Sequence, residues 1–293
     1  MSGRSASLPP RLSIPTVVGG VRLVWEEELL KTPGMKLENC RVVLVRPAGA
    51  ANVGAVARAM KNMGLHQLVL VHPRFRNRFW VRAMAVHAGD VLARMRVVEN
   101  LADAVADAGL VVGTTSRAGL YRTPLGSARE LAPGLVAAAQ SNVVALVFGP
   151  EDHGLSNEDI KWCHQLLTIP ASPEYPSLNL AQAVMVVCYE LFLAAQAQPQ
   201  GELGPRWAPA RDVEFLFQRL RDAFLRIGYL HPQNPDHILF AFRRILGRAG
   251  LEERDVKILL GLARQIEWYG DGGWRILQEK QREAGVTAAP EQR

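Results

Sequence analysis

Short apolar runs alternate along the middle of the chain with segments of helical periodicity. The runs cover residues 41–45, 67–71, 110–113 and 143–148. Short, nearly continuous apolar runs bounded by turn residues are typical of strands buried on both faces. The segments between them predict helices at about 53–63, 101–107 and 128–139. Alternating strands and helices predict an α/β fold in which helices cover both faces of a mostly parallel sheet.

The first of these helices divides into two kinds of surface. Its apolar stripe, at spacings of 0, 3, 4 and 7, consists of Val53, Val56, Ala57 and Met60. Arg58 and Lys61 lie on another side, beyond the small residue Gly54. We expect this surface to let a polymer backbone approach closely while the cations reach its phosphates; a solvated helix flank is the alternative. Gly64 is predicted to end the helix in the C-cap position.

A shift to Gln, Pro, Gly and Ala after residue 196 predicts a linker. Beyond it, amphipathic helices are predicted at 213–227, 237–246 and 255–269. We therefore expect five parts in chain order: a partly disordered N-terminal extension (1–37), an α/β domain (38–196), a linker (197–210), a helical extension (211–275) and a loose tail (276–293).

Charge and cysteine content narrow the class of protein. The chain has 34 basic and 28 acidic residues, and a net charge of +6 is compatible with a nucleic-acid partner. Cys40, Cys163 and Cys188 have no metal-like spacing, so we expect three plain thiols in the cytoplasm and no metal site. No apolar run reaches the roughly 18 residues of a membrane span, and no signal peptide is evident, so no membrane association is expected.

Polar residues gather where apolar runs end. They lie in three segments, residues 52–65, 148–156 and 177–184. Open α/β sheets bind ligands at the carboxyl ends of their strands, so these segments predict one composite site. Simple capping is the alternative: Ser156 with Asp159 would form a capping box, and Ser177 or Asn179 would cap the helix that follows.

Familiar phosphate-binding motifs do not fit the chain. Residues 49–54 have the glycine separation of a P-loop but lack the Lys-Ser/Thr pair that follows it. No G-x-G-x-x-G sequence follows any predicted strand, so a dinucleotide site is not expected.

The three polar segments together resemble a known family. Asn52-x-Gly-Ala-x-x-Arg58, Phe148-Gly-x-Glu-x-x-Gly-Leu155 and Ser177-Leu-Asn-Leu180 are similar to the three signature motifs of the SPOUT-superfamily RNA 2′-O-methyltransferases, in order and separation. The fuller pattern, including the helical tail, resembles the TrmJ branch. That branch methylates the ribose of the first nucleotide of the tRNA anticodon loop, position 32.

The resemblance implies a SPOUT-type parallel sheet with a C-terminal trefoil knot, tRNA as substrate and a homodimer in which each subunit completes the other's site. It also implies a pocket for S-adenosylmethionine, carried over to Thr114, Thr115, Ser116, Gly149, Ile169, Ser177 and Leu178. The reacting end would be lined by Asn52, Arg58, Glu151, Ser177 and Asn179. Two alternatives remain: the same chemistry on ribosomal RNA or another tRNA position, and a non-catalytic RNA-binding module on this fold.

Arg58 matches the arginine proposed as the base in this family. A guanidinium keeps its proton below a pH of about 12, so a base role would require strong desolvation and a nearby positive charge. We favour the other interpretation, in which Arg58 stays charged and grips the phosphate while water or Glu151 takes the proton.

A segment with interleaved arginines and aromatics follows the second predicted strand. It contains Arg74, Arg76, Arg78 and Arg82 together with Phe75, Phe79 and Trp80. Such a segment can bind phosphates and stack an unpaired base, so we expect it to contact RNA together with Arg58 and Lys61. The alternative is a loop whose aromatics pack on the core and leave its arginines in solvent.

Overall fold

The computed structural model describes residues 17–18, 21–22, 36–116, 119, 122–197 and 204–283. Residues 1–34 form a unit of their own, in which β1 (Val17–Val18) pairs antiparallel with β2 (Val21–Arg22). The predicted disorder of the N-terminal extension therefore concerns a segment almost wholly outside the described residues, as does the part of the predicted loose tail beyond residue 283.

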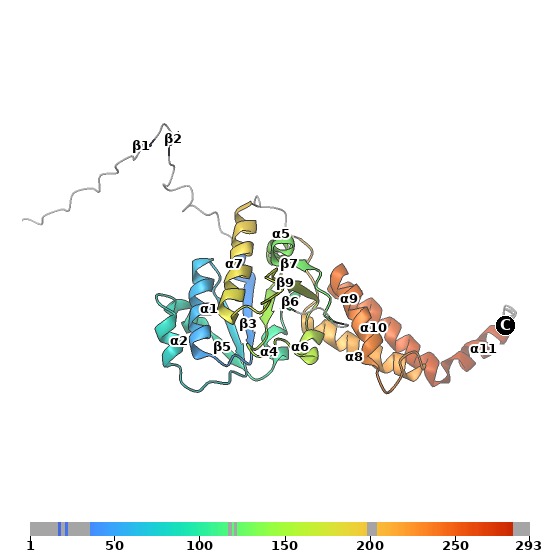
Figure 1. Cartoon of the computed structure of the whole chain (residues 1–293). Helices are drawn as coiled ribbons and strands as arrows, with labels where there is room; N and C mark the ends of the chain where they lie inside the picture. The colour runs from blue at the N-terminus through green and yellow to red at the C-terminus, as the bar shows by residue number, and fades with distance from the viewer. Residues whose placement is uncertain are drawn as a thin grey trace, which may run out of the picture. The chain divides into compact units, whose positions relative to one another are not determined.

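A parallel sheet lies at the centre of the unit formed by residues 35–293 (Figure 1). Its seven strands are β3 (Cys40–Val45), β4 (Gln67–Val71), β5 (Arg96–Val98), β6 (Leu110–Thr114), β7 (Gly126–Ser127), β8 (Val144–Phe148) and β9 (Gln165–Thr168). They lie in the order β5-β4-β3-β8-β6-β9-β7, and every pairing is parallel. The predicted α/β fold with a parallel sheet is confirmed.

Helices cover both faces of this sheet. They are η1 (Lys36–Asn39), α1 (Ala50–Asn62), α2 (Phe79–Met84), α3 (Gly89–Arg94), α4 (Leu101–Val105), α5 (Ala128–Ala139), α6 (Asn157–Lys161) and α7 (Leu180–Ala197). Side chains alternate along a strand, so Val42 and Leu44 of β3 pack with α1, α5 and α7, whereas Val43 and Val45 pack with α4 and α6. The predicted apolar stripe of α1 is fully buried, and Gly64 has the left-handed φ of 75° expected after a helix end.

The expectation for Gly54 is wrong. Gly54 is buried, and a Cβ there would lie 2.3 Å from the backbone oxygen of Val81 and 2.9 Å from the Cβ of Met84. A real Cβ cannot occupy that space, so the small residue is needed to let α2 pack closely on α1 rather than to admit a polymer backbone.

The C-terminal helices α8 (Ala210–Arg226), α9 (Asp236–Ala249) and α10 (Glu253–Trp268) form a third apolar cluster of their own. The irregular turn η2 (Tyr269–Gly273) and α11 (Trp274–Glu283) follow them in the chain. Helical structure thus continues beyond residue 275, where we placed the start of a loose tail. The backbone N–H of Ala210 donates to the carbonyl of Ala108 at 2.9 Å, and Arg243 donates to the carbonyl of Lys161 at 2.9 Å. These bonds attach α8 and α9 to the α/β domain.

By length and composition alone, α7 is apolar enough to cross a membrane. Its buried side chains, Leu180, Val184, Val187, Cys188 and Leu191, pack in the core shared with α1 and α5. Glu190 in its middle pairs with Arg129 of α5 at 2.9 Å. These contacts are those of a core helix in a folded domain.

Candidate active site

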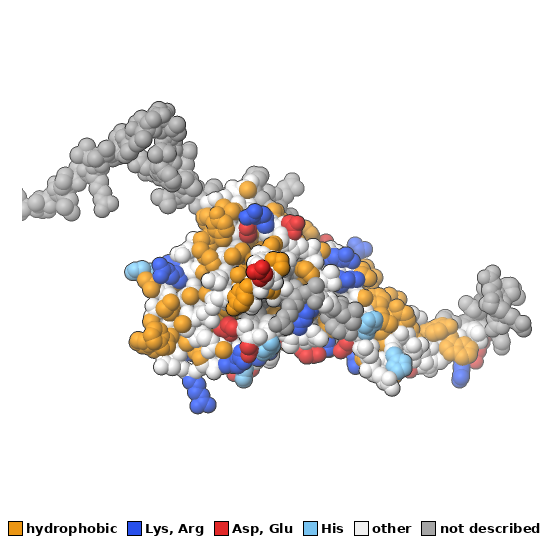
Figure 2. Space-filling model, viewed as in Figure 1, with side chains coloured by type: hydrophobic (Ala, Val, Ile, Leu, Met, Phe, Trp, Pro, Cys, Tyr) orange, Lys and Arg blue, Asp and Glu red, His pale blue; other side chains and the backbone are white. Residues whose placement is uncertain are grey.

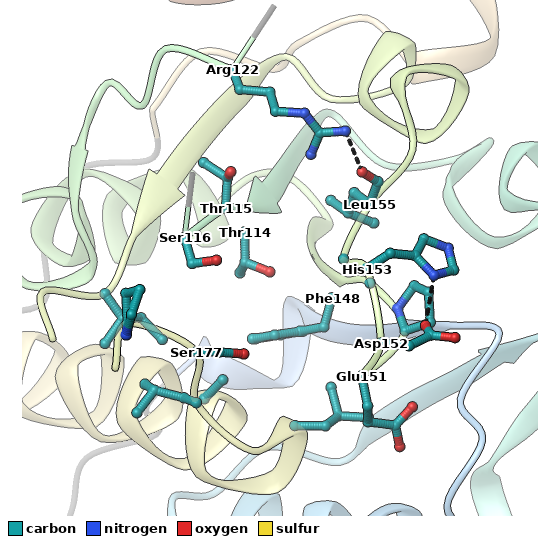
Figure 3. A pocket seen from close by; sticks show the side chains of 18 residues that line it. Thr114, Thr115, Ser116, Arg122, Phe148, Glu151, Asp152, His153, Leu155 and Ser177 are labelled. Carbon is teal, nitrogen blue, oxygen red and sulfur yellow. Dashed lines mark hydrogen bonds and ion pairs between the residues drawn. The ribbon is translucent and has the colours of Figure 1, made fainter. Parts of the chain in front are cut away.

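A cavity lies at the carboxyl ends of β6 and β8, where the sequence predicts the composite site (Figure 3). Its lining includes all seven residues carried over for the cofactor: Thr114, Thr115, Ser116, Gly149, Ile169, Ser177 and Leu178. They come from the ends of β6, β8 and β9 and from the segment just before α7, which the parallel sheet brings to one edge. The geometry is the one expected of a cofactor site, and the binding role of each residue stays a prediction.

Glu151 connects the second polar segment, residues 148–156, to the start of α1 through hydrogen bonds. One of its carboxylate oxygens accepts hydrogen bonds from Asn52 Nδ2 at 2.9 Å and from the N–H of Gly49 at 3.2 Å; the other accepts from the N–H of Ala48 at 3.0 Å. Asn179 Nδ2 in turn donates to Asn52 Oδ1 at 3.1 Å. Asn52, Glu151 and Asn179, one from each segment, therefore form a single hydrogen-bonded chain.

This bonding sets the charge of Glu151. Burial acts to raise the pKa of its carboxyl, but the bonds from Asn52, Ala48 and Gly49 outweigh burial and lower the pKa below its usual value. The side chain is a carboxylate at neutral pH, and its place at the start of α1 suits a negative charge. A carboxylate stabilised in this way is a weak base, which argues against Glu151 as the group that takes the hydroxyl proton.

Both capping alternatives are also observed. Ser156 and Asp159 form the capping box of α6, and Asn179 Oδ1 accepts from the N–H of Ala181 at 2.9 Å at the start of α7. Asn179 does both tasks, because its Oδ1 caps the helix while its Nδ2 reaches Asn52. Capping therefore does not compete with a place in the site.

Within one subunit, Arg58 is not part of the hydrogen-bonded chain formed by Asn52, Glu151 and Asn179. It is exposed, does not line the cavity, and forms no ion pair with any residue that the structure describes. Arg58 comes six positions after Asn52, so it lies about 9 Å further along the helix axis and a third of a turn around it, on a different face. Arg58 is thus directed toward solvent and away from Glu151.

Gly149 is required by the fold of its own loop. A Cβ there would lie 2.2 Å from both the carbonyl carbon of Gly154 and the nitrogen of Leu155. The resemblance places Gly149 in the cofactor pocket, where a glycine would leave space for the ligand, but the closest obstacle to a side chain is backbone of the same loop.

The arginine segment divides into two parts in the structure. Arg74 forms a bidentate pair with Asp152 at 3.0 and 3.2 Å, and its Nε donates to the carbonyl of Arg46 at 3.1 Å. The hydrogen bond from Arg74 lowers the pKa of Asp152 to about 2. Lys61 similarly pairs with Asp90 at 2.7 Å. These two cations have carboxylate partners within the chain, and their RNA contact stays a prediction.

The other three arginines of the segment, Arg76, Arg78 and Arg82, are exposed and form no ion pair with any described residue. Phe75 packs against the core, as in the loop alternative, but Phe79 and Trp80 are 64% and 55% exposed and contact each other edge to face. Exposed aromatics beside unpaired cations favour a binding surface over a packed loop.

One cavity residue was missed by the sequence reasoning. Arg122 donates from Nη2 to the carbonyl of Leu155 at 2.6 Å and to Asn157 Oδ1 at 3.2 Å (Figure 3). It thereby joins the loop after β6 to the loop after β8 at the end of the cavity opposite Glu151. No periodicity marks it; its only signal is that it follows Thr114–Ser116 in the same loop.

The cavity combines hydroxyl groups, the carboxylates of Glu151 and Asp152, the guanidinium of Arg122 and an apolar wall. The wall is formed by Phe148, Leu155, Ile169, Leu178 and Leu180. Among the described residues, no group of three His, Cys, Asp or Glu side chains is placed to hold a metal ion. The lining suits a ligand that has both an apolar part and polar groups.

Comparison with known proteins assigns the chain to a family. The model of the SpoU rRNA Methylase family matches residues 39–189, and that of the tRNA methyltransferase TrmJ, C-terminal domain, matches residues 211–283. The tRNA (cytidine/uridine-2'-O-)-methyltransferase TrmJ of Klebsiella pneumoniae is 39% identical over 242 residues, which cover 80% of this chain and 99% of the relative. TrmJ of Escherichia coli K12 is 38% identical over 241 residues, covering 80% and 98%.

A solved structure agrees. The crystal structure of TrmJ from Z. mobilis ZM4 superposes with a TM-score of 0.65 at 32% identity, covering 78% of this chain and 98% of that one. The chain is therefore a methyltransferase of the SpoU methylase family and belongs to its TrmJ branch.

Proposed function

We propose that this protein transfers a methyl group from S-adenosylmethionine to a ribose 2′-hydroxyl of tRNA, at the first nucleotide of the anticodon loop, and that it does so in the cytoplasm as a homodimer. The observation that carries the proposal is the single cavity lined by all seven predicted cofactor residues beside the Asn52–Glu151–Asn179 chain. Its TrmJ relatives, which match over nearly their whole length, act on cytidine and uridine of tRNA.

The cavity residues fit this cofactor. Ile169, Leu155 and Leu178 provide an apolar slot for a planar base, and Thr114, Ser116 and Ser177 provide hydroxyls for polar groups. Glu151 carries a negative charge beside the cavity, which suits a sulfonium cation, whereas the charge of Asp152 is paired with Arg74. S-adenosylmethionine, when bound there, supplies a methyl group already activated for transfer.

The protein's own side chains at this end of the cavity would then position the attacking ribose. Asn52 and Asn179 hold the starts of α1 and α7 together, and Ser177, two residues before Asn179, lines the cavity. Arg58, directed away from its own cavity, would be delivered to the partner's. There its charge would grip the phosphate and lower the pKa of the 2′-hydroxyl, and water would take the proton.

The homodimer is supported by the exposed apolar side of α7. Only five of its 18 residues are buried, and Tyr189 and Leu193 are exposed on the opposite side of the helix. Apolar side chains lie over α7 in the space-filling view (Figure 2). An apolar helix face of this kind is typical of a surface that packs against another protein. We propose that two copies pair through this face and that Arg58 of each subunit enters the cavity of the other.

A trefoil knot is supported by the strand order. β6 and β7 follow each other in the chain, yet β9 lies between them and pairs with both. We propose that the segment leading from β9 to α7 passes through the loop that joins β6 to β7, which would bring residues 169–178 into the cavity.

The test is to incubate the full chain with S-adenosylmethionine labelled on its methyl group and with tRNA transcripts, and then to map 2′-O-methyl groups. We expect one methylated ribose in the anticodon loop. Methylation of ribosomal RNA alone, or of another tRNA position, would favour the alternative targets. Cofactor binding without transfer to any RNA would contradict the enzymatic proposal.

A further inference from the structure

A second cavity lies between α9 and the edge of the sheet at β9. Its volume is about 470 Å³, within the range of small-ligand sites. One wall is a stripe of α9 made by His237, Phe240, Ala241, Arg244 and Arg248, at the spacing of a single helix face. The other wall is formed by residues 123–125 and 163–166, together with Ile160.

The cavity walls are fixed rather than formed by loosely placed helices. A Cβ on Gly247 would lie 2.3 Å from the carbonyl oxygen of His164, so α9 packs directly on the backbone before β9. Arg243 pairs with Glu214 at 2.6 Å, and Lys161 pairs with Asp236 at 2.8 Å. Because these contacts hold both ends of α9, the cavity is a built feature of the fold.

The charged residues that line this second cavity are all basic. Its described lining contains no Asp or Glu, and Arg244 and Arg248 are exposed and form no ion pair with any described residue. They are four residues apart on one helix face, about 6 Å from each other. Basic side chains gather over α9 in the space-filling view (Figure 2). An anionic group such as a phosphate suits this position.

The interior is apolar and has one oriented donor. Leu166, Ile160 and Phe240 offer flat or aliphatic surface. His164 Nδ1 accepts a hydrogen bond from the N–H of Val111 at 3.1 Å, so the ring proton is on Nε2. Burial, and then the charge of Arg243, lower the pKa of His164 to about 4, so the ring is neutral. No described residue accepts a hydrogen bond from its Nε2.

We propose that this cavity is a second RNA subsite that holds one unstacked nucleotide of the substrate, with its phosphate on Arg244 and Arg248 and its base against Phe240 and Leu166. The inference rests on the proposed function, because it assigns a further contact to the same RNA. An apolar slot with a basic rim is the combination by which proteins hold single-stranded nucleotides. The subsite would fix the position of the RNA relative to the catalytic cavity.

The decisive variant fills the cavity without changing charge. Ala241 lines it and is exposed, so Ala241→Trp should fold normally and occupy the space of the base. Ala249→Trp, at the exposed end of the same helix and outside the lining, is the matched control. We expect Ala241→Trp to raise the Kd for tRNA at least tenfold, measured by fluorescence anisotropy on the full chain. Ala249→Trp should bind as the wild type does.

The charge test uses Arg244→Ala with Arg248→Ala, against Arg264→Ala on the exposed surface of α10 as control. The double variant should lower the slope of log K against log salt by up to about two. Affinity for S-adenosylmethionine, measured by calorimetry, should be unchanged in every variant.

A third arm separates RNA from free nucleotides by titrating the four nucleoside 5′-monophosphates. Wild-type tRNA affinity in Ala241→Trp would overturn the subsite, and tight binding of a free mononucleotide with unaltered tRNA affinity would reassign the cavity to a small molecule. Both results leave the proposed function intact if the wild type methylates tRNA. Failure of the wild type to methylate any RNA would instead contradict the proposed function itself.

Discussion

At the residue scale, Glu151 is a carboxylate whose charge is stabilised by hydrogen bonds from Asn52, Ala48 and Gly49. Because its folded pKa is lowered below the ordinary 4.5, the unfolded chain takes up this proton first as the pH falls. Its contribution to stability is therefore full above about pH 4.5 and is lost as the pH falls through the folded pKa.

Glu151→Gln removes this titration while keeping the shape of the side chain. We expect the difference in melting temperature between wild type and variant to be largest near neutral pH and to shrink below pH 4.5. Thermal unfolding from pH 3 to pH 8 measures it. Glu174→Gln, on the exposed loop before α7, is the control and should follow the wild type. A constant difference at all pH values would show that Glu151 is not the carboxylate we describe.

Arg58 is the residue on which the proposed reaction depends. Arg58→Ala should lower methyl transfer at least 100-fold, which is roughly 3 kcal/mol in the barrier, while cofactor affinity stays the same. Arg58→Lys should also be poor, because lysine lacks the planar pair of donors. Arg94→Ala, another exposed arginine without an ion pair among the described residues, is the control. Mixed dimers of Arg58→Ala with a cofactor-site variant should regain activity if the site is shared between subunits.

Gly149 and Gly134 make a matched pair for testing loop geometry. A Cβ at Gly149 would meet backbone at 2.2 Å, whereas one at Gly134 in α5 meets nothing within 4 Å. Gly149→Ala should therefore lower the melting temperature and the cofactor affinity together. Gly134→Ala should stabilise by up to about 1 kcal/mol, because alanine is the better helix former. Loss of cofactor affinity at an unchanged melting temperature would return Gly149 to the interpretation in which it only leaves space for the ligand.

At the scale of elements, α2 and the loop before it carry the three exposed arginines of the arginine segment that have no ion pair among the described residues. Replacing Arg76, Arg78 and Arg82 by alanine should weaken tRNA binding and lower the salt slope by up to about three. Arg74 is left unchanged, because its pair with Asp152 holds the loop after β8. Binding measured from 50 to 300 mM salt tests this, and an unaltered slope would make these arginines ordinary solvated residues.

The elements that the sequence predicts well are those with long apolar patterns. The stripe of α1 and the runs of β3, β4, β6 and β8 are sufficient to place the three polar segments at one edge of the sheet. β7 and β5 have only two and three residues, too few for a period to show. The position of β9 between β6 and β7 depends on contacts between distant segments, which no local pattern encodes.

Gly54 shows a different limit of local reasoning. Its small size is visible in the sequence, but the neighbour that needs the space is α2 (Phe79–Met84), a helix much later in the chain. The same holds for Arg74, which is a candidate for RNA contact by sequence and an ion-pair partner of Asp152 in the fold.

At the scale of the whole molecule, the question is how far the α/β domain depends on the C-terminal helices. Every residue lining the first cavity precedes residue 197, so that cavity does not need the helices. The helices are nevertheless attached: Ala210 is buried in the core of the α/β domain, and Asn142 accepts from the N–H of Trp207 at 2.8 Å. Removing them would expose part of that core, including Leu166 and Ile160, on the wall of the second cavity.

A chain ending at Ala197 should therefore fold with a melting temperature lowered by at least about 2–4 °C, the shift that a loss of 1 kcal/mol produces at this size. It should bind S-adenosylmethionine as the full chain does and lose most tRNA affinity, because Arg244, Arg248 and the second cavity are gone. Chromatography, calorimetry and a methylation assay on the one protein separate the outcomes. An aggregated fragment would mean that the helices mainly cover apolar surface. A soluble fragment that methylates tRNA at the full rate would show that the C-terminal helices take no part in recognising the RNA.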